Sequence, residues 1–418
     1  MMDKFIIKGG KKLKGEIKVN GAKNSAGPIL AATLLTKEEC LIGNIPKVSD
    51  ILDMVDILEN LGKEVEWVGE RQVRIKGGDL NPLKMDFEKV SKSRVSVLLI
   101  GALLPRVREF KMSRPGGDRI GLRPINIHLE ALKNLGVEIK EEGDFYYLKS
   151  KSIKGADIVL SEFSVTATEN LILASVLAQG KTIIHGAAEE PQVEDLASFL
   201  NKMGARVKNV GSHCWEINGV EKLKGAEHEL IPDPNEAGTF LAIGAACAEK
   251  LRVKNINPKH LTLFLKKLRQ AGVAFQERTD EIEVEGQDCF KPVKIQALPY
   301  PGFPTDLLPL VVPLLTQAVG KSLIHDPLYE NRLNYVQELR KMGADIEIVD
   351  PHRAFVLGKT PLRGMTIESW DIRAGASLLL AGLMAFGATT LKNISQIDRG
   401  YEKIEERLKA IGADIVRL

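Results

Sequence analysis

One short signature occurs six times in the chain of 418 residues. Its copies are LENLGKEVEW, LKNLGVEIK, LNKMGARVK, LRQAGVAFQ, LRKMGADIEI and LKAIGADIVRL. The glycines of successive copies, from Gly62 to Gly412, are separated by 74, 68, 68, 71 and 69 residues. A fixed period of this length indicates one structural unit copied in tandem, so the repeat limits the possible folds more strongly than any other feature.

Each copy marks the end of an amphipathic helix and the start of a strand. In the first unit, apolar side chains occur at helical spacing at Val48, Ile51, Leu52, Val55 and Leu58. The glycine is expected to end the helix as a C-cap, and a strand-like run such as ADIEIV follows it.

A second helix, apolar on nearly every side, opens each unit. The six segments are SAGPILAATLL, SVLLIGALL, TENLILASVLA, AGTFLAIGAACA, TDLLPLVVPLL and RAGASLLLAGLMA. Such helices belong inside a core, and a strand such as TIIHGA or TTLKNI follows them. The sequence therefore predicts an α/β (α+β) protein of six βαβαββ-type units in two pseudo-symmetric domains, with helices inside and sheets outside.

The composition is that of a globular protein, with 44% apolar residues, 27% charged residues and a mean hydropathy of −0.06. A net charge of +3 gives no sign of a nucleic-acid-binding face. The N-terminus does not resemble a secretory signal and no apolar run is long enough to span a bilayer, so we expect a cytoplasmic protein. The scattered Cys40, Cys214, Cys247 and Cys289 favour buried, reduced thiols over zinc or disulfides.

The turns that enter the six apolar helices are rich in Lys, Arg, Asp and Asn. They are GAKNSAGP, SKSRVS, SEFSVTATE, PDPNEAGT, PGFPTD and SWDIRAGA. Helix N-termini offer free N–H groups to anions, so a cleft between the domains lined by these turns is predicted to bind phosphate. For any single turn, a simple helix cap is the alternative.

Six motifs, in order and over essentially the whole chain, resemble a known family. They are NGAKNSAGPIL, PGGDRIGLRPINIH, YPGFPTDLLPL, YENRLNYVQELRKMGA, WDIRAGASLLLAG and DRGYEKIEERLKAIGA. The chain resembles the UDP-N-acetylglucosamine 1-carboxyvinyltransferases, which are enolpyruvyl transferases.

The resemblance implies transfer of the enolpyruvyl group of phosphoenolpyruvate to the 3-hydroxyl of UDP-N-acetylglucosamine, with release of phosphate. It implies the family's inside-out α/β barrel fold, with one domain at 22–230 carrying a lid loop at 114–124, and a second domain formed by 1–21 and 231–418. The active site is expected in the cleft between them. No metal or other cofactor is implied, the two substrates are the expected partners, and we expect a monomer that binds neither nucleic acid nor membrane.

Phosphoenolpyruvate carries both a carboxylate and a phosphate, so its site must supply several fixed cations. The resemblance assigns to it Lys23, Arg94, Arg123, Arg373 and Arg399, and it also gives Lys23 and Arg399 a catalytic role. For one arginine taken alone, a surface salt bridge is the alternative.

A carboxylate is expected near the sugar hydroxyl. Asp306, at the end of PGFPTD, matches the family's candidate base, and a helix N-cap is its alternative. Asp371 could position Arg373 or help in proton transfer. Glu330 and Arg332 of the YENR motif are interpreted either as an acid and a base lining the cleft or as a structural ion pair.

The resemblance assigns the sugar nucleotide to several segments. Asn24 would orient the sugar or the tetrahedral intermediate, and a helix cap is its alternative. Ser164, Val165 and Thr166 match a diphosphate-binding helix entrance. The uridine stretch and the remaining contacts are Arg123, Pro124, Ile125, Asn126, Ile127, His128, Arg94, Asp306 and Leu328.

Two positions depart from the family pattern around the nucleotide. Asn126 replaces a common Asp, and its amide can still pair with uracil. Glu162 lies where many relatives carry a basic residue, and a carboxylate facing a diphosphate would repel it.

A third departure lies in the lid, where Asp118 replaces the cysteine of most relatives. That group is thought to act as the acid toward the methylene carbon of phosphoenolpyruvate or to help product leave. We expect Asp118 to be protonated mainly in the closed complex, because bound anionic substrate and exclusion of water oppose the effect of Arg119 and Arg123.

The lid glycines Gly116, Gly117 and Gly121 would allow the backbone changes that closure requires. A flexible surface loop with an incidental Asp is the alternative. Fosfomycin inactivates relatives through the cysteine thiolate, so the protein is predicted to be insensitive to it.

Two other functions compete with this interpretation. The shikimate 3-phosphate enolpyruvyl transferase shares the architecture, but its PGDKS-type run is absent and NGAKN occupies that place. A non-catalytic sugar-nucleotide-binding paralogue would account for Asp118 and Glu162, but it would have no use for a base at the acceptor hydroxyl.

Overall fold

The computed structural model describes residues 3–118 and 120–418. The chain forms two compact units. Unit 1 comprises Met1–Asn20, Asp118–Arg123 and Pro232–Leu418, and unit 2 comprises Gly21–Gly117 and Pro124–Ile231. The sequence assigned the whole lid to the domain of residues 22–230, whereas Asp118–Arg123 groups with unit 1 in the structure. Arg119 lies outside the described residues.

The described residues form six sheets, three in each unit. The strand orders in unit 2 are β13-β3-β5-β4, β6-β8-β7 and β9-β10-β12-β11. Those in unit 1 are β2-β14-β16-β15, β17-β18-β20-β19 and β21-β22-β1-β23. Each four-stranded sheet has one parallel pair followed by two antiparallel pairs, as the βαβαββ pattern predicts.

The strands are short, as the repeat period requires. In unit 2 they are β3 (Cys40–Gly43), β4 (Glu64–Gly69), β5 (Gln72–Lys76), β6 (Glu109–Ser113), β7 (Glu138–Glu142), β8 (Phe145–Lys149), β9 (Asp157–Val159), β10 (Lys181–His185), β11 (Arg206–Asn209), β12 (Cys214–Asn218) and β13 (Glu227–Glu229). In unit 1 they are β1 (Lys4–Lys8), β2 (Leu13–Lys18), β14 (Ala248–Lys254), β15 (Phe275–Glu277), β16 (Glu281–Val284), β17 (Lys294–Gln296), β18 (Gly320–His325), β19 (Asp345–Asp350), β20 (Arg353–Gly358), β21 (Thr366–Glu368), β22 (Ala388–Lys392) and β23 (Asp414–Arg417).

The first two strands of the chain complete sheets built mainly by its second half. β1 pairs antiparallel with both β22 and β23, and β2 pairs parallel with β14. Unit 1 is therefore closed by strands from the N-terminal end of the sequence.

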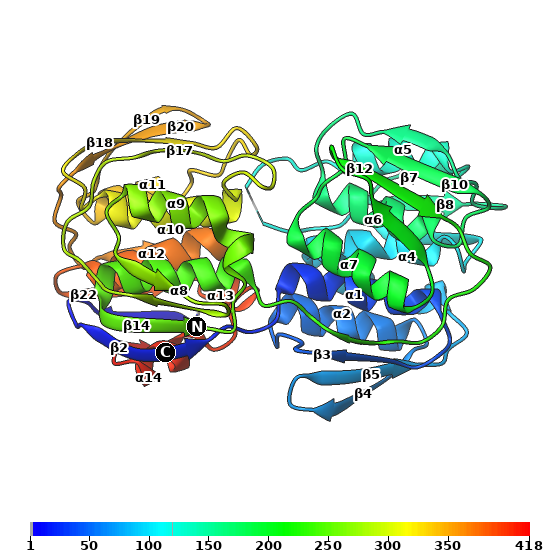
Figure 1. Cartoon of the computed structure of the whole chain (residues 1–418), viewed down its shortest axis with the longest axis horizontal. Coiled ribbons are helices and arrows are strands. Elements are labelled where there is room, and N and C mark those ends of the chain that lie inside the picture. The colour runs from blue at the N-terminus through cyan, green and yellow to red at the C-terminus, as the bar shows by residue number, and fades with distance from the viewer. Residues whose placement is uncertain (1–2, 119) are drawn as a thin grey trace. The chain divides into compact units, whose positions relative to one another are not determined.

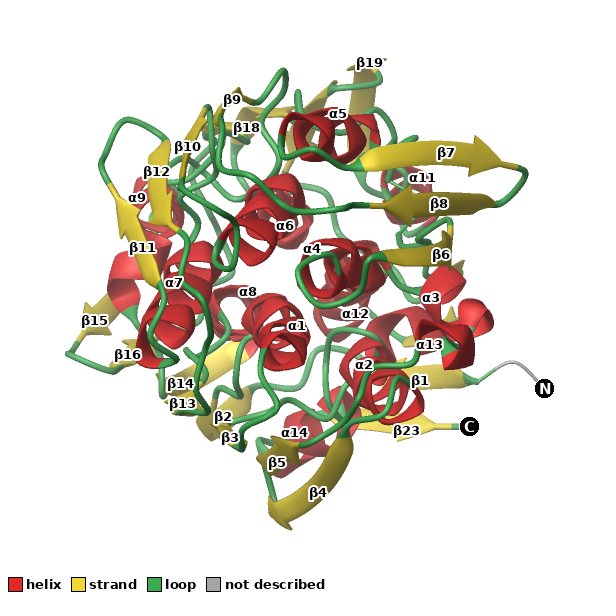
Figure 2. Cartoon of the chain, turned by 90° about the vertical axis from the view of Figure 1, so that its right-hand side faces the viewer, coloured by secondary structure: helices red, strands yellow, loops and turns green. Residues whose placement is uncertain are grey.

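Apolar helices fill the interior of each unit. They are α1 (Lys23–Ala32), η3 with α4 (Arg94–Leu98 and Leu99–Leu103) and α6 (Val165–Ser175) in unit 2, and α8 (Pro234–Cys247), α10 (Leu308–Leu315) and α12 (Ile372–Met384) in unit 1. Figure 2 shows α1, α4 and α6 in the middle of unit 2, with its sheets around them. In Figure 1, α8, α10 and α12 lie between the β17–β20 sheet and the sheet that holds β2 and β14.

Amphipathic helices make up the other helical set. They are α2 (Ser49–Asn60), α5 (Asn126–Asn134) and α7 (Pro191–Lys202) in unit 2, and α9 (Thr262–Gln270), α11 (Val336–Lys341) and α14 (Ile404–Ala410) in unit 1. The remaining short helices are α3 (Phe87–Lys92), α13 (Ser395–Asp398), η1 (Thr33–Leu35), η2 (Pro82–Lys84), η4 (Pro258–Leu261) and η5 (Thr305–Leu307).

The repeated signature is a helix-ending motif. Its six glycines have φ between +87° and +108°, a conformation that costs glycine little. The residue after each glycine donates its N–H to the carbonyl of the leucine five positions earlier, as in Lys63 to Leu58 at 3.0 Å and Ala413 to Leu408 at 3.0 Å. The leucine and the glycine recur together because one bonded turn requires both.

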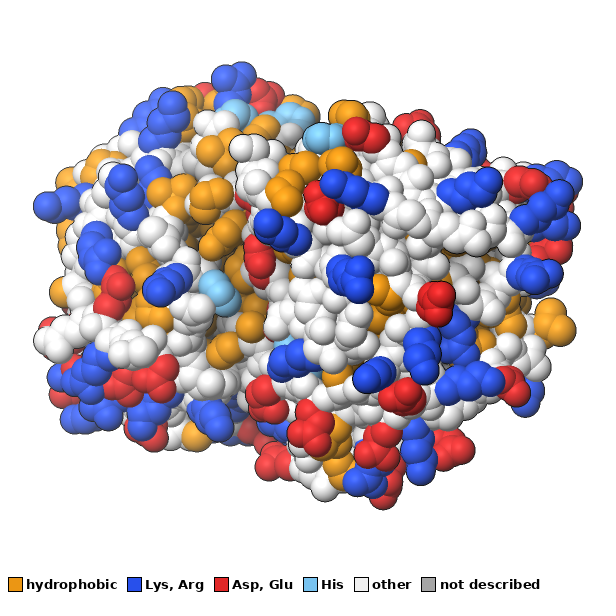
Figure 3. Space-filling view, turned by 45° about the vertical axis from the view of Figure 1, so that its right-hand side comes forward, with side chains coloured by type: hydrophobic (Ala, Val, Ile, Leu, Met, Phe, Trp, Pro, Cys, Tyr) orange, Lys and Arg blue, Asp and Glu red, His pale blue; other side chains and the backbone are white. Residues whose placement is uncertain are grey.

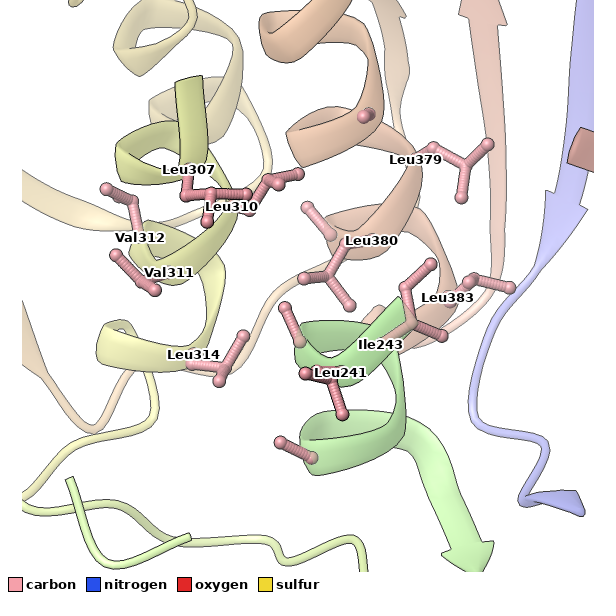
Figure 4. Close-up of a cluster of buried hydrophobic side chains, with 14 of the residues drawn as sticks. Leu241, Ile243, Leu307, Leu310, Val311, Val312, Leu314, Leu379, Leu380 and Leu383 are labelled. Atoms are coloured by element: carbon pink, nitrogen blue, oxygen red, sulfur yellow. The ribbon is translucent and has the colours of Figure 1, made fainter. Parts of the chain in front are cut away.

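Each unit has its own hydrophobic core, because the two clusters of buried side chains fall entirely within unit 1 and unit 2. Figure 4 shows side chains of α8, α10 and α12 that meet in the core of unit 1: Leu241, Ile243, Leu310, Leu314, Leu380 and Leu383. Burying one such side chain stabilises the fold by about 1.5–3 kcal/mol.

Two expectations from the composition can be compared with the structure. Throughout residues 3–118 and 120–418, every helix is too short or too polar to cross a membrane. The expectation of buried thiols holds for Cys40 and Cys247 but is wrong for Cys289, which is exposed, and Cys214 is half-buried. Cys289 lies outside the named strands, one residue before an isolated bridge, so no sheet covers it.

Candidate functional site

In unit 1 the N-terminal ends of the three inner helices meet at one carboxylate. Asp306 lies in η5, which leads into α10. Its Oδ2 accepts hydrogen bonds from Arg373 Nε of α12 at 3.1 Å and from Asn235 Nδ2 of α8 at 3.5 Å. Its Oδ1 accepts one from Arg332 Nη2. Helix N-termini carry partial positive charge, so both the helix ends and the two arginines favour an anion at this position.

The charge state of Asp306 follows from these contacts. Burial alone would raise its pKa, but the guanidinium groups of Arg373 and Arg332 outweigh burial and hold the pKa of Asp306 well below its ordinary value. Both arginines are nearly inaccessible, at 3% and 1% exposure, whereas the Asp306 side chain is 30% exposed. Asp306 is thus an ionised carboxylate that a ligand can still reach.

Asp371 is the N-cap of α12. Its Oδ1 accepts hydrogen bonds from the backbone N–H groups of Arg373 and Ala374, both at 2.9 Å. Its Oδ2 accepts one from Asn334 Nδ2 at 3.0 Å. With both oxygens occupied and 1% of the residue exposed, the geometry supports the first of its two predicted roles, that of positioning Arg373.

The described part of the lid docks on the YENR segment of unit 1. The backbone N–H of Asn331 donates to the carbonyl of Ile120 at 3.0 Å. The guanidinium of Arg123 lies 5.6 Å from the centre of the Tyr329 ring, and that of Arg332 lies 5.8 Å from the same ring. Through Tyr329 the lid therefore contacts the arginine that binds Asp306.

Asp118 forms an ion pair with Arg399. The Arg399 Nη1 to Asp118 Oδ1 distance is 2.6 Å, and the two side chains are 15% and 14% exposed. Arg399 Nη1 also donates to Gln396 Oε1 at 3.1 Å. Asp118 is thus paired with one of the cations predicted to bind phosphoenolpyruvate.

The two charged residues of the YENR motif have different surroundings. Arg332 pairs with Asp306, while Glu330 is exposed and has no ion pair with Arg332 among the described contacts. The backbone of Gly121 lies close to Glu330, whose Oε2 would be 2.2 Å from a Cβ at that glycine.

In unit 2, Lys23 is the first residue of α1 and is 6% exposed. Its Nζ donates to Asp50 Oδ2 of α2 at 2.7 Å, and both side chains are 7% exposed. Asn24 follows it and is half-buried. The carboxylate fixes the ammonium group at the helix entrance.

A polar cluster of unit 2 links α5, α6 and the η3–α4 segment. His128 is 1% exposed, and its ring nitrogens lie 2.8 Å from Asn170 Nδ2 and 3.2 Å from Thr166 Oγ1. Burial, and then the nearby Arg94 guanidinium, lowers the pKa of His128 to about 3. The ring is therefore neutral at physiological pH.

The other predicted nucleotide residues of unit 2 lie at two helix entrances. Ser164 caps α6 by accepting a hydrogen bond from Ala167 N at 3.2 Å. Arg94 Nη2 donates to the carbonyl of Pro124 at 3.3 Å, just before α5 begins at Asn126. Of the remaining residues, Val165 and Ile127 are half-buried, and Ile125 lies in the core with 3% exposure. Three are exposed: Pro124, Asn126 and Glu162.

The predicted residues thus form two sets. Unit 1 holds Asp118, Arg123, Asp306, Leu328, Glu330, Arg332, Asp371, Arg373 and Arg399, with Leu328 37% exposed, and unit 2 holds Lys23, Asn24, Arg94 and residues 124–128 and 164–166. Sequence reasoning missed several residues that contact them: Asp50, Asn170, Asn235, Tyr329 and Asn334. Tyr329 lies within a quoted motif, and Asp50 opens a helix where an acid is normally read as a cap.

The surface and the titratable clusters add two facts. Figure 3 shows Lys and Arg interspersed with Asp and Glu on the face in view, so the charge of this face is mixed. Among the described residues, no group of three or more His, Cys, Asp or Glu side chains could hold a metal ion.

Comparison with known proteins gives full-length matches. The family model described as EPSP synthase (3-phosphoshikimate 1-carboxyvinyltransferase) matches residues 7–408. UDP-N-acetylglucosamine 1-carboxyvinyltransferase 1 of Carboxydothermus hydrogenoformans is 45% identical over 417 residues, covering 100% of this chain and 99% of the relative. The protein named UDP-N-acetylglucosamine 1-carboxyvinyltransferase in Koribacter versatilis is 43% identical, with 100% and 97% covered.

Solved structures share the architecture. The enolpyruvyl transferase NikO from Streptomyces tendae matches with a TM-score of 0.92 and 25% identity, covering 100% of this chain and 99% of NikO. EPSP synthase from Acinetobacter baumannii matches with a TM-score of 0.76 and 20% identity over 100% of both chains, a likeness of fold alone. The predicted fold class is confirmed.

Proposed function

The chain belongs to the enolpyruvyl transferase family, and we infer that it is the enzyme that transfers the enolpyruvyl group of phosphoenolpyruvate to the 3-hydroxyl of UDP-N-acetylglucosamine. The observation that carries this conclusion is the similarity over the full chain to relatives named for that reaction, at 45% and 43% identity. The product is the first committed precursor of peptidoglycan.

The reaction is an addition followed by an elimination. The sugar O3 bonds to C2 of phosphoenolpyruvate as a proton is added to the methylene carbon, which gives a tetrahedral intermediate. Loss of a proton from that methyl carbon and departure of inorganic phosphate then restore the double bond. No electrons are exchanged with a cofactor, so the residues must supply charge, orientation and proton transfer.

We assign the base at the sugar hydroxyl to Asp306. It is the one member of its charged cluster with substantial exposure, and the two buried arginines keep it ionised. A carboxylate this strongly stabilised is a weak base, so proton removal must accompany formation of the C–O bond. Loss of the Arg373 contact to an incoming anion would strengthen the base at the moment it is needed.

Arg399 is assigned to phosphoenolpyruvate, and Asp118 competes with that substrate for it. In this structure the Asp118 carboxylate occupies the Arg399 guanidinium at 2.6 Å. An incoming carboxylate or phosphate would take over that contact, and its negative charge favours the protonated form of Asp118. Asp118 could then donate its proton to the methylene carbon.

The remaining assignments follow the two helix entrances of unit 2. Lys23 is fixed by Asp50 and completes the cations for phosphoenolpyruvate, with Arg94, Arg123 and Arg373. The N-terminus of α6 at Ser164–Thr166 is assigned to the diphosphate, and the segment at the start of α5 to the uracil.

A phosphate-release assay tests this function. Purified protein is supplied with phosphoenolpyruvate and one of two acceptors, UDP-N-acetylglucosamine or shikimate 3-phosphate. We expect release only with the sugar nucleotide. Release with shikimate 3-phosphate alone would contradict the assignment of substrate.

Asp306→Ala separates catalysis from binding. We expect a loss of turnover of at least about a hundredfold, within the range of general base catalysis, while calorimetry still detects UDP-N-acetylglucosamine binding. A wild-type protein that binds the nucleotide without releasing phosphate would instead be the non-catalytic paralogue.

A further inference from the structure

The hydrogen-bond pattern around Asn170 fixes the orientation of its amide. The backbone N–H of Gly101 points at Oδ1 from 2.8 Å, so this atom is the oxygen. Nδ2 lies 2.9 Å from the carbonyl of Val97, which can only accept. The opposite orientation would place a donor against a donor and an acceptor against an acceptor.

The amide in turn fixes the tautomer of His128. One Nδ2 hydrogen of Asn170 is used by Val97, and the other points at His128 Nδ1 from 2.8 Å. Nδ1 must therefore be the acceptor and carry no hydrogen, which leaves the ring proton on Nε2. Burial and Arg94 keep the second proton off the ring.

The tautomer then decides how the Thr166 hydroxyl is used. The Nε2–H of His128 donates to Thr166 Oγ1 across 3.2 Å. That bond occupies a lone pair and leaves the hydroxyl hydrogen of Thr166 without an acceptor among the described residues. Thr168, two positions later, differs, because its hydroxyl donates to Ser164 O at 2.9 Å and accepts from Ala188 N at 2.9 Å.

Thr166 is placed so that its unused hydroxyl hydrogen can bond to a ligand at the start of α6. Thr166 is the second residue of α6, is half-buried, and follows the Ser164 cap. The first-turn N–H groups of α6 and the hydroxyl lie at the same helix end. An anionic oxygen at that end would find several donors, while the exposed Glu162, two residues before the Ser164 cap, adds one negative charge nearby.

We propose that His128 is a positioning residue which, held by Asn170, makes the Thr166 hydroxyl a donor to a diphosphate oxygen of the sugar nucleotide. This inference rests on the proposed function and deepens it. It gives His128 an indirect role, because both of its ring nitrogens already have protein partners.

The tautomer can be tested without substrate. Protein labelled with ¹⁵N-histidine is observed by NMR at neutral pH, and the His128 signals are identified by their absence in His128→Phe. We expect a neutral ring protonated on Nε2. A ring protonated on Nδ1, or on both nitrogens, would overturn the relay whatever the enzyme's activity.

The hydroxyl is tested by kinetics in the complete enzyme. Thr166→Val should raise the KM for UDP-N-acetylglucosamine and weaken UDP binding about tenfold to a hundredfold, the effect of losing one hydrogen bond to a charged acceptor. The KM for phosphoenolpyruvate and kcat should change little. Thr166→Ser keeps the hydroxyl and should restore the affinity.

Controls separate this role from a structural one. Thr168→Val, on the same helix, should lower the melting temperature and leave the KM for the nucleotide unchanged. In a double-mutant cycle, His128→Phe should weaken UDP binding in the parent but not in Thr166→Val.

Two outcomes would contradict the proposal. Wild-type nucleotide affinity in Thr166→Val would overturn the inference and leave the proposed function standing. No phosphate release from the wild-type enzyme with both substrates would overturn the proposed function, and this inference with it. If His128→Phe does not fold, the tautomer of the wild-type protein and the Thr166 variants decide the question.

Discussion

Asp118 lies at the position where most relatives are expected to carry a nucleophilic sulfur. Its carboxylate pairs with Arg399, and both side chains are largely buried. A cysteine could not form a comparable ion pair as a thiol. The replacement therefore changes the contacts of the lid as well as its chemistry.

Fosfomycin sensitivity tests the chemistry at Asp118. We expect the wild-type enzyme to keep its activity during incubation with fosfomycin, because opening the epoxide requires a thiolate at this position. Asp118→Cys should be inactivated with time and gain a covalent adduct, measured by mass spectrometry. Asp118→Asn removes the charge without adding a thiol and is the matched control. An adduct on the wild-type lid would refute the prediction.

His128 should make the fold sensitive to acid. Its pKa is about 3 in the folded protein, whereas an unfolded histidine titrates near ~6.5. The unfolded state therefore binds the extra proton first, and the stability conferred by the neutral ring is lost as pH falls from about 6.5 toward 3. Between pH 6.5 and 4.5 the loss should be about 2–3 kcal/mol.

Urea unfolding at several pH values measures this effect. The non-titrating variant His128→Phe should be less stable at neutral pH but show a smaller loss in acid than the wild type. Equal slopes for wild type and His128→Phe would show that the folded state binds the His128 proton as readily as the unfolded state does, so that folding does not lower the pKa of His128.

At the scale of elements, the lid docks through its backbone as much as through its side chains. Gly121 has φ of +155°, which side chains rarely adopt, and a Cβ there would lie 2.2 Å from Glu330 Oε2. The carbonyl of Ile120 bonds to Asn331 N beside it. The carboxylate end of the exposed Glu330 can move aside, so it is the backbone conformation of Gly121 that favours glycine where the lid docks on the YENR segment.

Gly121→Ala should weaken lid docking. Strain of this kind costs about 1–3 kcal/mol, so we expect kcat/KM for phosphoenolpyruvate to fall roughly tenfold, measured by phosphate release. Gly143→Ala, in the β7–β8 turn, is the control, because Gly143 also has positive φ (+56°) but has no atom within 4 Å of the added Cβ. An unchanged kcat/KM in Gly121→Ala would argue against a docked lid in the reaction.

The inner helices explain why the charged residues are where they are. Asn235, Asp306 and Arg373 each lie at or next to the start of a different inner helix of unit 1, and both Asn235 and Arg373 contact Asp306. Helices that are apolar throughout can be buried along their length, so polar groups are left to their ends. The ends of copied helices then come together because the copies pack against one another.

At the scale of the whole molecule, each unit is stabilised by its own core, and unit 1 depends on strands from the start of the chain. Ile7 of β1 is fully buried in the core of unit 1, and Ile29 of α1 is fully buried in that of unit 2. A cavity at either position should destabilise the unit that contains it.

Hydrogen exchange can distinguish the two cases. Ile7→Ala should cost about 2–5 kcal/mol and speed exchange in β22 and β23, while α1 and β3 stay protected. Ile29→Ala is the matched variant and should do the reverse. Faster exchange throughout the chain in both variants would mean that the units unfold together.

Much of the fold was predictable because its determinants are local. A buried leucine, a glycine with positive φ and a following strand lie within one turn of each other, so Leu58, Gly62 and Lys63 already describe the helix end. The βαβαββ order follows from the same short-range periodicity. The thiols were predicted less well, because burial of a single residue such as Cys289 depends on neighbours that have no local pattern.

The sequence by itself determined six copied units, their helix ends, and the six turns that hold the charged residues. Only the tertiary structure decided which charges pair: Arg399 with Asp118, 281 positions away, Asp306 with both Arg332 and Arg373, and the His128 ring with Asn170 and Thr166. The reason is physical, since periodicity and capping act over a few residues, whereas an ion pair or a fixed tautomer forms only when distant chain segments have packed and excluded water.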